Sequence, residues 1–207
     1  MKNEQDYIGD IKEIRNIMER TTRFISLSGL SGILSGLYAL AGAWLAFRIL
    51  NSRNVTSGYR KIYLDDFNMI KTLALIAITV LVLALLSGVW LSYIKSKRQN
   101  IVFWGSGSRQ FLFSLLIPLV TGGLLIIILA LKGNYTLIAP SFLVFYGLAL
   151  IAGGKFTVSY IQWLGYLEIL LGLACATIPE YGLLFWSLGF GVLHILYGII
   201  MIVKYGL

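Results

Sequence analysis

Six long apolar stretches, separated by short polar breaks, restrict the folds that this sequence can adopt. They cover residues 24–47, 70–94, 111–131, 137–153, 157–177 and 181–203. A helix of about 17–25 apolar residues can cross the ~30 Å hydrocarbon core of a bilayer. Barrel strands, the other solution to backbone hydrogen bonding in lipid, would alternate polar and apolar residues, and these stretches do not. The sequence therefore predicts an all-α, polytopic integral membrane protein, a bundle of six transmembrane helices.

The composition agrees with a membrane bundle and leaves little room for anything else. The chain has 207 residues, of which 58% are hydrophobic and 13% charged. A water-soluble fold would expose more apolar surface than such proteins tolerate. We therefore divide the chain into one transmembrane domain, residues 24–207, and an N-terminal segment, residues 1–23. In that segment Tyr7, Ile11, Ile14 and Met18 follow a helical spacing, which predicts a short amphipathic helix at the cytoplasmic membrane surface.

The distribution of basic residues predicts the topology. The net charge is +8, and most of this charge lies in the breaks between the apolar stretches. With both termini inside, the inner side holds the larger share of the 17 Lys and Arg residues: Lys2, Lys12, Arg15, Arg20, Arg23, Lys95, Lys97, Arg98, Arg109, Lys155 and Lys204. The positive-inside rule then places both termini in the cytoplasm. We expect a multi-pass protein of a bacterial inner membrane whose cations meet lipid head groups and not nucleic acid.

The first apolar stretch carries small residues at four-residue spacing, namely Ser28, Gly32 and Gly36. Such a face lets helix backbones approach closely in lipid. It predicts packing within the chain, or a homodimer or membrane protein partner bound through this helix and the N-terminal helix. The same region reads Gly29-Leu30-Ser31-Gly32, the GxSG form that intramembrane serine proteases use around a nucleophile. Ser31 with a histidine base is the enzyme alternative, which we rank below a non-enzymatic role because the small-residue pattern continues beyond the motif.

Two ionisable residues, Glu168 and His194, form the strongest candidate site. Glu168 is the one acid deep inside an apolar stretch, and His194 is the one histidine of the chain. Both lie thirteen positions from Tyr181, the centre of the turn that joins the last two stretches. At about 1.5 Å rise per residue they are expected at the same depth, about 20 Å from the turn. An unpaired charge at mid-membrane costs at least ~2.5–3.5 kcal/mol, so we expect the two side chains to pair.

Each of these residues also sits in a stripe of small residues at helical spacing. Facing stripes on the last two helices would bring the carboxyl and imidazole groups together. The expected packing residues of these helices are Gly165, Gly172, Gly191 and Gly198. Depth and polarity add further candidates for the site: Ser35, Tyr38, Thr121, Tyr146 and Tyr197. No metal or cofactor is expected, since one histidine and one carboxylate fall short of the usual three or four ligands and Cys175 is the single cysteine.

Two functions follow from this interpretation. In the first, the chain is a small transporter or channel-like protein, and Glu168 with His194 forms a mid-membrane site for a proton or a small polar ligand. In the second, it is a non-catalytic membrane partner, assembly or sensor subunit, and the pair is structural. The sequence alone leaves both open.

Overall fold

A computed structural model describes residues 28–51, 67–98 and 103–205. Every regular element in these ranges is helical, which confirms the all-α prediction. The long helices are α2 (Gly29–Asn51), α3 (Phe67–Arg98), α4 (Ser106–Leu131), α5 (Ile138–Gly154), α6 (Tyr160–Thr177) and α8 (His194–Tyr205). Shorter elements connect them: η1 (Tyr135–Leu137), η2 (Pro179–Tyr181), α7 (Gly182–Trp186) and η3 (Ser187–Leu193).

Six helical segments in the described residues are long and apolar enough to cross a membrane, as predicted. Their bounds differ from the predicted ones by a few residues; α4, for example, begins at Ser106 and not at 111. The helices α3 and α4 begin before their apolar stretches because polar residues at their ends still form helical turns, which apolarity alone does not reveal. The predicted N-terminal helix, residues 1–23, lies outside the described residues.

The sixth segment is not a uniform α-helix. It runs from α7 through a π-helix, η3, into α8 without leaving the bundle. A π-helix closes i→i+5 hydrogen bonds, so residues five apart come to share one face, and such turns often occur at functional sites. The change of phase between Ser187 and Leu193 alters which residues of this segment face the rest of the bundle.

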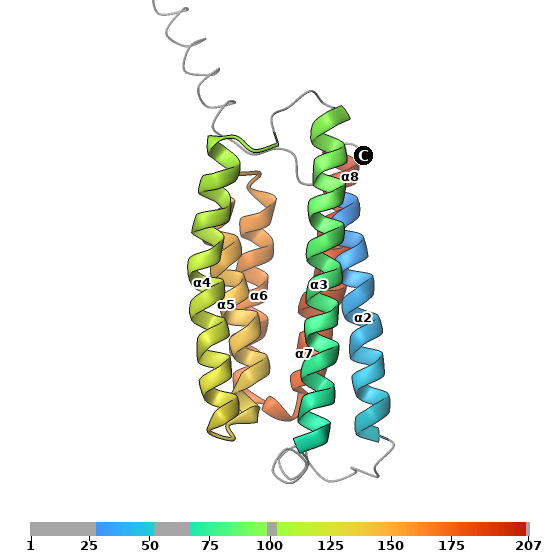
Figure 1. The fold of residues 1–207 in the computed structure, drawn as a ribbon, viewed down its shortest axis with the longest axis vertical. Helices are drawn as coiled ribbons and strands as arrows, with labels where there is room; N and C mark the ends of the chain where they lie inside the picture. The colour runs from blue at the N-terminus through green and yellow to red at the C-terminus, as the bar shows by residue number, and fades with distance from the viewer. Residues whose placement is uncertain (1–27, 52–66, 99–102, 206–207) are drawn as a thin grey trace, which may run out of the picture.

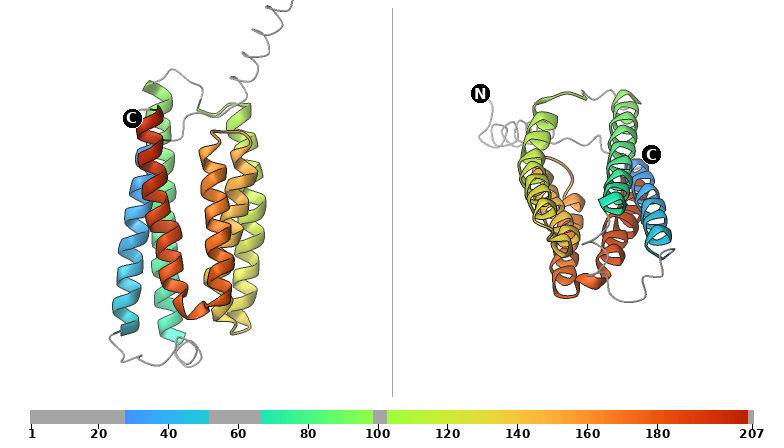
Figure 2. Two further views of the ribbon diagram at one scale, coloured as in Figure 1. Left: turned by 180° about the vertical axis from the view of Figure 1, so that it is seen from behind. Right: turned by 60° about the horizontal axis from the view of Figure 1, so that its bottom comes forward.

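The helices form two groups of three that stand side by side (Figures 1 and 2). In one group α5 packs between α4 and α6, and in the other α2 packs between α3 and the α7–α8 segment. Neighbouring helices in each group are antiparallel, as the colour order in Figure 1 shows. The groups meet in part through a buried cluster that joins α8 to α5 and α6, formed by Leu150, Val158, Ile161, Leu164 and Met201.

Glycines bring the paired helices of each group into backbone contact. A Cβ atom on Gly36 of α2 would lie 2.6 Å from the carbonyl oxygen of Gly191, and one on Gly198 would lie 2.5 Å from that of Gly29. The small-residue face of α2 is therefore occupied by α8 and its preceding π-helix within the same chain. A partner that bound through this face would have to displace them.

The same contacts correct the expectation of facing stripes. Gly165 and Gly172 of α6 pack on α5, at Gly147 and Val144, and Gly191 and Gly198 of the last segment pack on α2. The two stripes do not face each other. The α-helical projection that suggested this takes no account of the phase change in the π-helix, and it cannot say which neighbour a glycine face meets.

The outer surface is apolar on the helices at the edge of each group. Trp90 of α3 is 68% exposed and Phe113 of α4 is 67% exposed. Contiguous exposed apolar surface on this scale is typical of contact with lipid or with another protein.

Candidate functional site

Glu168 lies near the middle of α6 and is completely buried, with 0% of its surface exposed. Its Oε1 atom is 3.6 Å from Nδ1 of His194, so the two groups meet across the boundary between the helix groups. Gly189 of the π-helix lies against the carboxyl group, since a Cβ there would be 2.5 Å from Oε2 of Glu168. Among the described residues neither carboxyl oxygen has a hydrogen-bond partner.

His194, by contrast, has both ring nitrogens engaged. Nδ1 lies 3.0 Å from the carbonyl oxygen of Gly189, and Nε2 lies 2.7 Å from the hydroxyl of Tyr146 on α5. A carbonyl oxygen can only accept, which assigns a hydrogen to Nδ1. In the neutral ring Nε2 then accepts the hydrogen bond that Tyr146 donates. The hydrogen on Nδ1 is directed to Gly189, so Glu168 faces the imidazole at a longer distance than a hydrogen bond.

Aromatic rings hold this arrangement on the side of the imidazole. Phe190, on the π-helix, stacks with His194 at 5.9 Å between ring centroids and contacts Tyr146 at 4.9 Å. Trp186 extends the stack from Phe190. These rings fix the imidazole plane, and with it the direction of both ring nitrogens.

Of the seven residues predicted for the site, the structure brings three into contact: Glu168, His194 and Tyr146. The other four form no hydrogen bond with Glu168 or His194. Thr121 is exposed on α4 and donates to the carbonyl of Ile117. Tyr197 packs against the same buried cluster as Tyr146. Ser35 and Tyr38 are half-buried on α2, and neither forms a hydrogen bond with the Glu168 carboxyl.

Ser31 and His194, the residues of the enzyme alternative, do not hydrogen-bond to each other. Ser31 donates to the carbonyl of Ser28 at 2.6 Å, while both nitrogens of His194 bond to other groups. The nucleophile–base contact that a serine enzyme needs is therefore not formed. No group of three His, Cys, Asp or Glu side chains comes together in the described part of the chain.

The sequence contains a signal for this site that the helix-by-helix analysis missed. Residues 165–172 read Gly-Tyr-Leu-Glu-Ile-Leu-Leu-Gly, and residues 191–198 read Gly-Val-Leu-His-Ile-Leu-Tyr-Gly. The two octets are identical at five positions, and they place Glu168 and His194 at the same position of the repeat. In Figure 1 the two helices run in opposite directions, so the repeat is inverted.

The glycine contacts extend this equivalence to the partner helices. A Cβ on Gly147 of α5 would lie 2.6 Å from the oxygen of Gly165 and 2.7 Å from Cγ1 of Ile169. A Cβ on Gly36 of α2 would lie 2.6 Å from the oxygen of Gly191 and 2.6 Å from Cγ1 of Ile195. The α5–α6 pair and the pair of α2 with the last segment are thus packed by the same contacts. Glu168 and His194 meet where these two inverted units join.

The two units differ at one position that bears on the site. Tyr146 precedes Gly147 on α5, and the residue that precedes the equivalent Gly36 on α2 is Ser35. Tyr146 supplies a hydroxyl to His194 in the opposite unit. The shorter Ser35 supplies none to Glu168, whose oxygens have no partner in the described residues. The carboxyl group is therefore the member of the site whose hydrogen-bonding capacity is unused.

Comparison with known proteins adds no family to this description. No protein-family model, curated protein or solved structure matches the chain.

Proposed function

We propose that the chain is a multi-pass membrane protein with cytoplasmic termini, and that it works as a small transporter or channel-like protein. In this proposal Glu168 binds a proton or the polar group of a small ligand halfway across the bilayer. His194 faces the carboxyl group, and Tyr146 and Gly189 fix the orientation of its ring.

The observation that carries the proposal is the completely buried Glu168 carboxyl, which has no hydrogen-bond partner in the described residues. Burial of a polar group without a partner is unfavourable, and burial of an unpaired charge is more so. A bound proton removes the charge, and a ligand with an N–H or O–H group supplies the missing donor. A residue kept in such a position is usually functional in membrane proteins.

The inverted units give this site a means of changing the side of the membrane to which the Glu168 carboxyl is exposed. Many secondary transporters consist of inverted repeats, bind substrate near the bilayer midplane at the repeat interface, and work by rocking one unit against the other. Here Gly147 and Gly165 pack α5 on α6, and Gly36 and Gly198 pack α2 on the last segment, while Gly189 contacts Glu168 across the boundary. Glu168 belongs to one unit, while His194 and Gly189 belong to the other. Rocking about this boundary would expose the carboxyl to one side of the membrane and then to the other.

A proton-flux experiment tests the proposal. The full-length protein is reconstituted into liposomes that contain a pH-sensitive dye, and a proton gradient is imposed with and without small polar solutes outside. Glu168→Gln keeps the shape of the side chain but cannot release a proton, so we expect it to abolish solute-dependent proton flux. Glu180→Gln is the matched control, because Glu180 is exposed in the η2 turn and makes no contact with the site.

A structural role is the second candidate, and one observation favours it. The hydrogen bond from Tyr146 to His194 joins α5 to α8 and therefore links the two helix groups. If the pair serves only to hold an assembly or sensor subunit together, Glu168→Gln would lower thermal stability and leave proton flux at the level of the wild type. Proton flux that is the same in wild type and Glu168→Gln would thus reject the transport proposal.

A further inference from the structure

The hydrogen on Nδ1 of His194 lies between two acceptors. Nδ1 is 3.0 Å from the carbonyl oxygen of Gly189 and 3.6 Å from Oε1 of Glu168. Hydrogen bonds from an N–H group to a carboxylate measure about 2.7–2.9 Å, so a relative movement of less than about 1 Å would pass this bond from the carbonyl to the carboxyl group. The structure shows the arrangement in which Gly189 accepts it.

Gly189 is also part of the π-helix η3, which separates α7 from α8. In a π-helix the carbonyl of residue 189 pairs with the N–H of residue 194, and in an α-helix it pairs with the N–H of residue 193. The imidazole of His194 thus bonds to the carbonyl whose backbone partner differs between the two helix types. While Nδ1 donates to this oxygen, residue 194 is held over residue 189, and the π-helix is favoured.

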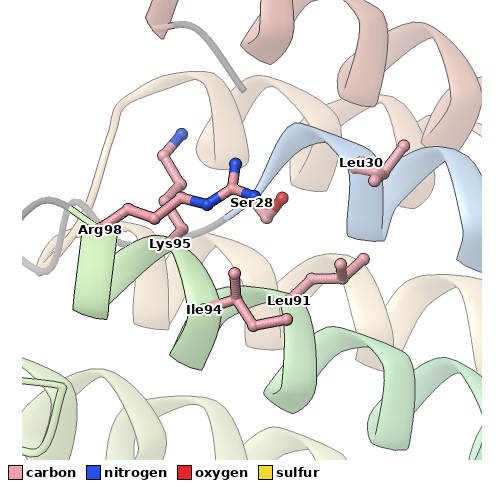
Figure 3. Close-up of a pocket in the computed structure, with 6 residues that line it drawn as sticks. All are labelled: Ser28, Leu30, Leu91, Ile94, Lys95 and Arg98. Carbon is pink, nitrogen blue, oxygen red and sulfur yellow. The ribbon is translucent and has the colours of Figure 1, made fainter.

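The surroundings restrict the pair to small movements. Glu168 is 0% exposed, and a Cβ on Gly189 would lie 2.5 Å from its Oε2 atom. A cavity of about 150 Å³, drawn in Figure 3, shares no residue with this site; it is lined by Ser28, Leu30, Leu91, Ile94, Lys95 and Arg98. Groups in a packed core change between discrete contacts and do not move over long distances.

Two tyrosines are the other titratable side chains beside the pair. Tyr146 of α5 donates to Nε2 of His194, and Tyr197 of α8 interacts with Tyr146. The elements α7 and η3 contain no titratable residue. Helix α2, which packs on η3, contains no acid or histidine and carries its single cation in its last turn. A tyrosine is neutral near physiological pH, so Glu168 is the member of this cluster that can supply a negative charge.

We propose that the proton on Glu168 controls the helix type of the last segment through His194. This inference rests on the proposed binding of a proton by Glu168 and adds the conformational response. With the carboxyl group protonated, Nδ1–H donates to the Gly189 carbonyl and the π-helix is retained. When Glu168 releases its proton to the aqueous phase, the buried carboxylate becomes a stronger acceptor than the carbonyl, and Nδ1–H turns to it. The hydrogen stays on Nδ1, and the carbonyl of Gly189 pairs with the N–H of residue 193 as the turn becomes α-helical.

The expected consequence is a rotation of α7. One residue of an α-helix corresponds to about 100°, so loss of the π-turn shifts the phase of the residues on one side of it by about that angle. Helix α8 is held on α2, since a Cβ on Gly198 would lie 2.5 Å from the carbonyl oxygen of Gly29. Helix α7 has five residues and follows the η2 turn. We therefore expect α7 to rotate and α8 to stay in place.

Solid-state NMR of the full-length protein in liposomes tests the first step. His194 is the single histidine of the chain, so ¹⁵N-histidine labelling gives the signals of one ring. From acidic to alkaline buffer we expect the Nδ1–H proton resonance to move downfield, while Nε2 stays unprotonated. Glu168→Gln is neutral at every pH and should show no movement. Glu180→Gln, in the exposed η2 turn, is the matched control and should behave as the wild type.

A wild-type resonance that does not move would overturn the switch. A movement that persists in Glu168→Gln, or a titration of Nε2 in its place, would overturn it as well, because the imidazole would then respond to pH without the carboxyl group.

Spin labels on either side of the π-helix test the second step. In a Cys175→Ala background, labels are attached at Leu184→Cys in α7 and at Leu196→Cys in α8, two positions that are 51% and 49% exposed. Alkaline buffer should change the mobility of the α7 label and leave that of the α8 label unchanged. In Glu168→Gln neither label should respond. Equal responses of the two labels would contradict a change of phase at the π-helix.

These measurements separate the switch from transport. Solute-dependent proton flux together with an unmoved Nδ1–H resonance would overturn the switch and leave the proposed function. A moving resonance and a responding α7 label in a protein without flux would support the switch and reject transport.

Discussion

Replacement of Gly189 by alanine should disrupt the packing of the candidate site. A Cβ at this position would lie 2.5 Å from Oε2 of Glu168 and 2.5 Å from Cδ2 of Leu143. Both neighbours are completely buried at 0% exposure, so neither can move into open space. Overpacking of a well-packed core costs about 1–3 kcal/mol. The carboxyl group would be pushed away from Gly189, and its distance from the imidazole would change.

Gly123 of α4 provides the control for this substitution. A Cβ there meets nothing within 4 Å, so Gly123→Ala adds a methyl group in open space. Alanine is favoured over glycine in a helix by about 1 kcal/mol, and this gain is shared by both variants to a first approximation. The difference between them should therefore approach the overpacking cost of about 1–3 kcal/mol.

Thermal unfolding in detergent micelles, followed by tryptophan fluorescence, measures this difference. For a chain of this size 1 kcal/mol corresponds to about 2–4 °C in Tm. We expect Gly189→Ala to melt several degrees below Gly123→Ala and to lose proton flux in liposomes. If the two variants melt together and both retain flux, the packing of the carboxyl group against the π-helix is wrong.

Three further predictions concern the rest of the bundle. Gly36→Ala should destabilise the protein, because its Cβ would lie 2.6 Å from a backbone oxygen that cannot move alone. Gly88→Ala is the control, since a Cβ there has nothing within 4 Å and should leave stability unchanged. Equal melting temperatures of the two variants would contradict the close packing of α2. Tyr146→Phe removes the hydroxyl that donates to Nε2 of His194 and keeps the ring. We expect the free energy of unfolding to fall by about 0.6 kcal/mol, which is typical of interhelical hydrogen bonds in membranes, and the ¹⁵N resonance of the histidine ring to shift. An unchanged resonance would exclude the hydrogen bond. In cells, an impermeant thiol reagent should label Lys132→Cys and not Lys155→Cys, and the reverse pattern would invert the topology.

The sequence was sufficient for the fold class and for part of the site. The lengths of the apolar stretches predicted six membrane-length helices, and the described residues contain six. This prediction is possible because the length of an apolar helix decides whether it can cross a bilayer. The equal distance of Glu168 and His194 from the turn predicted a common depth, and Oε1 and Nδ1 of the two side chains lie 3.6 Å apart. The facing stripes from which a hydrogen bond between them was expected are not formed. Both inferences rest on the constant rise of a helix, which holds well enough through short irregularities.

Rotation about the helix axes was predicted less well. The π-helix changes the phase of the last segment, so Gly189 and not Gly191 lies against Glu168. Depth alone could not separate Tyr146 from Tyr38, because both lie about halfway along their helices, and only packing decides which one reaches the imidazole. The octet repeat would have helped, since it pairs Glu168 with His194 directly from the sequence.

Infrared difference spectroscopy between acidic and alkaline buffer addresses the carboxyl group itself. Reconstituted wild type and Glu180→Gln should both show a protonated carboxyl C=O band, at the frequency of a buried group, whose intensity changes with pH. Glu168→Gln should lack that band. A band that survives in Glu168→Gln, or a wild-type carboxyl signal that never responds to pH, would mean that Glu168 does not exchange a proton and that the central proposal is wrong.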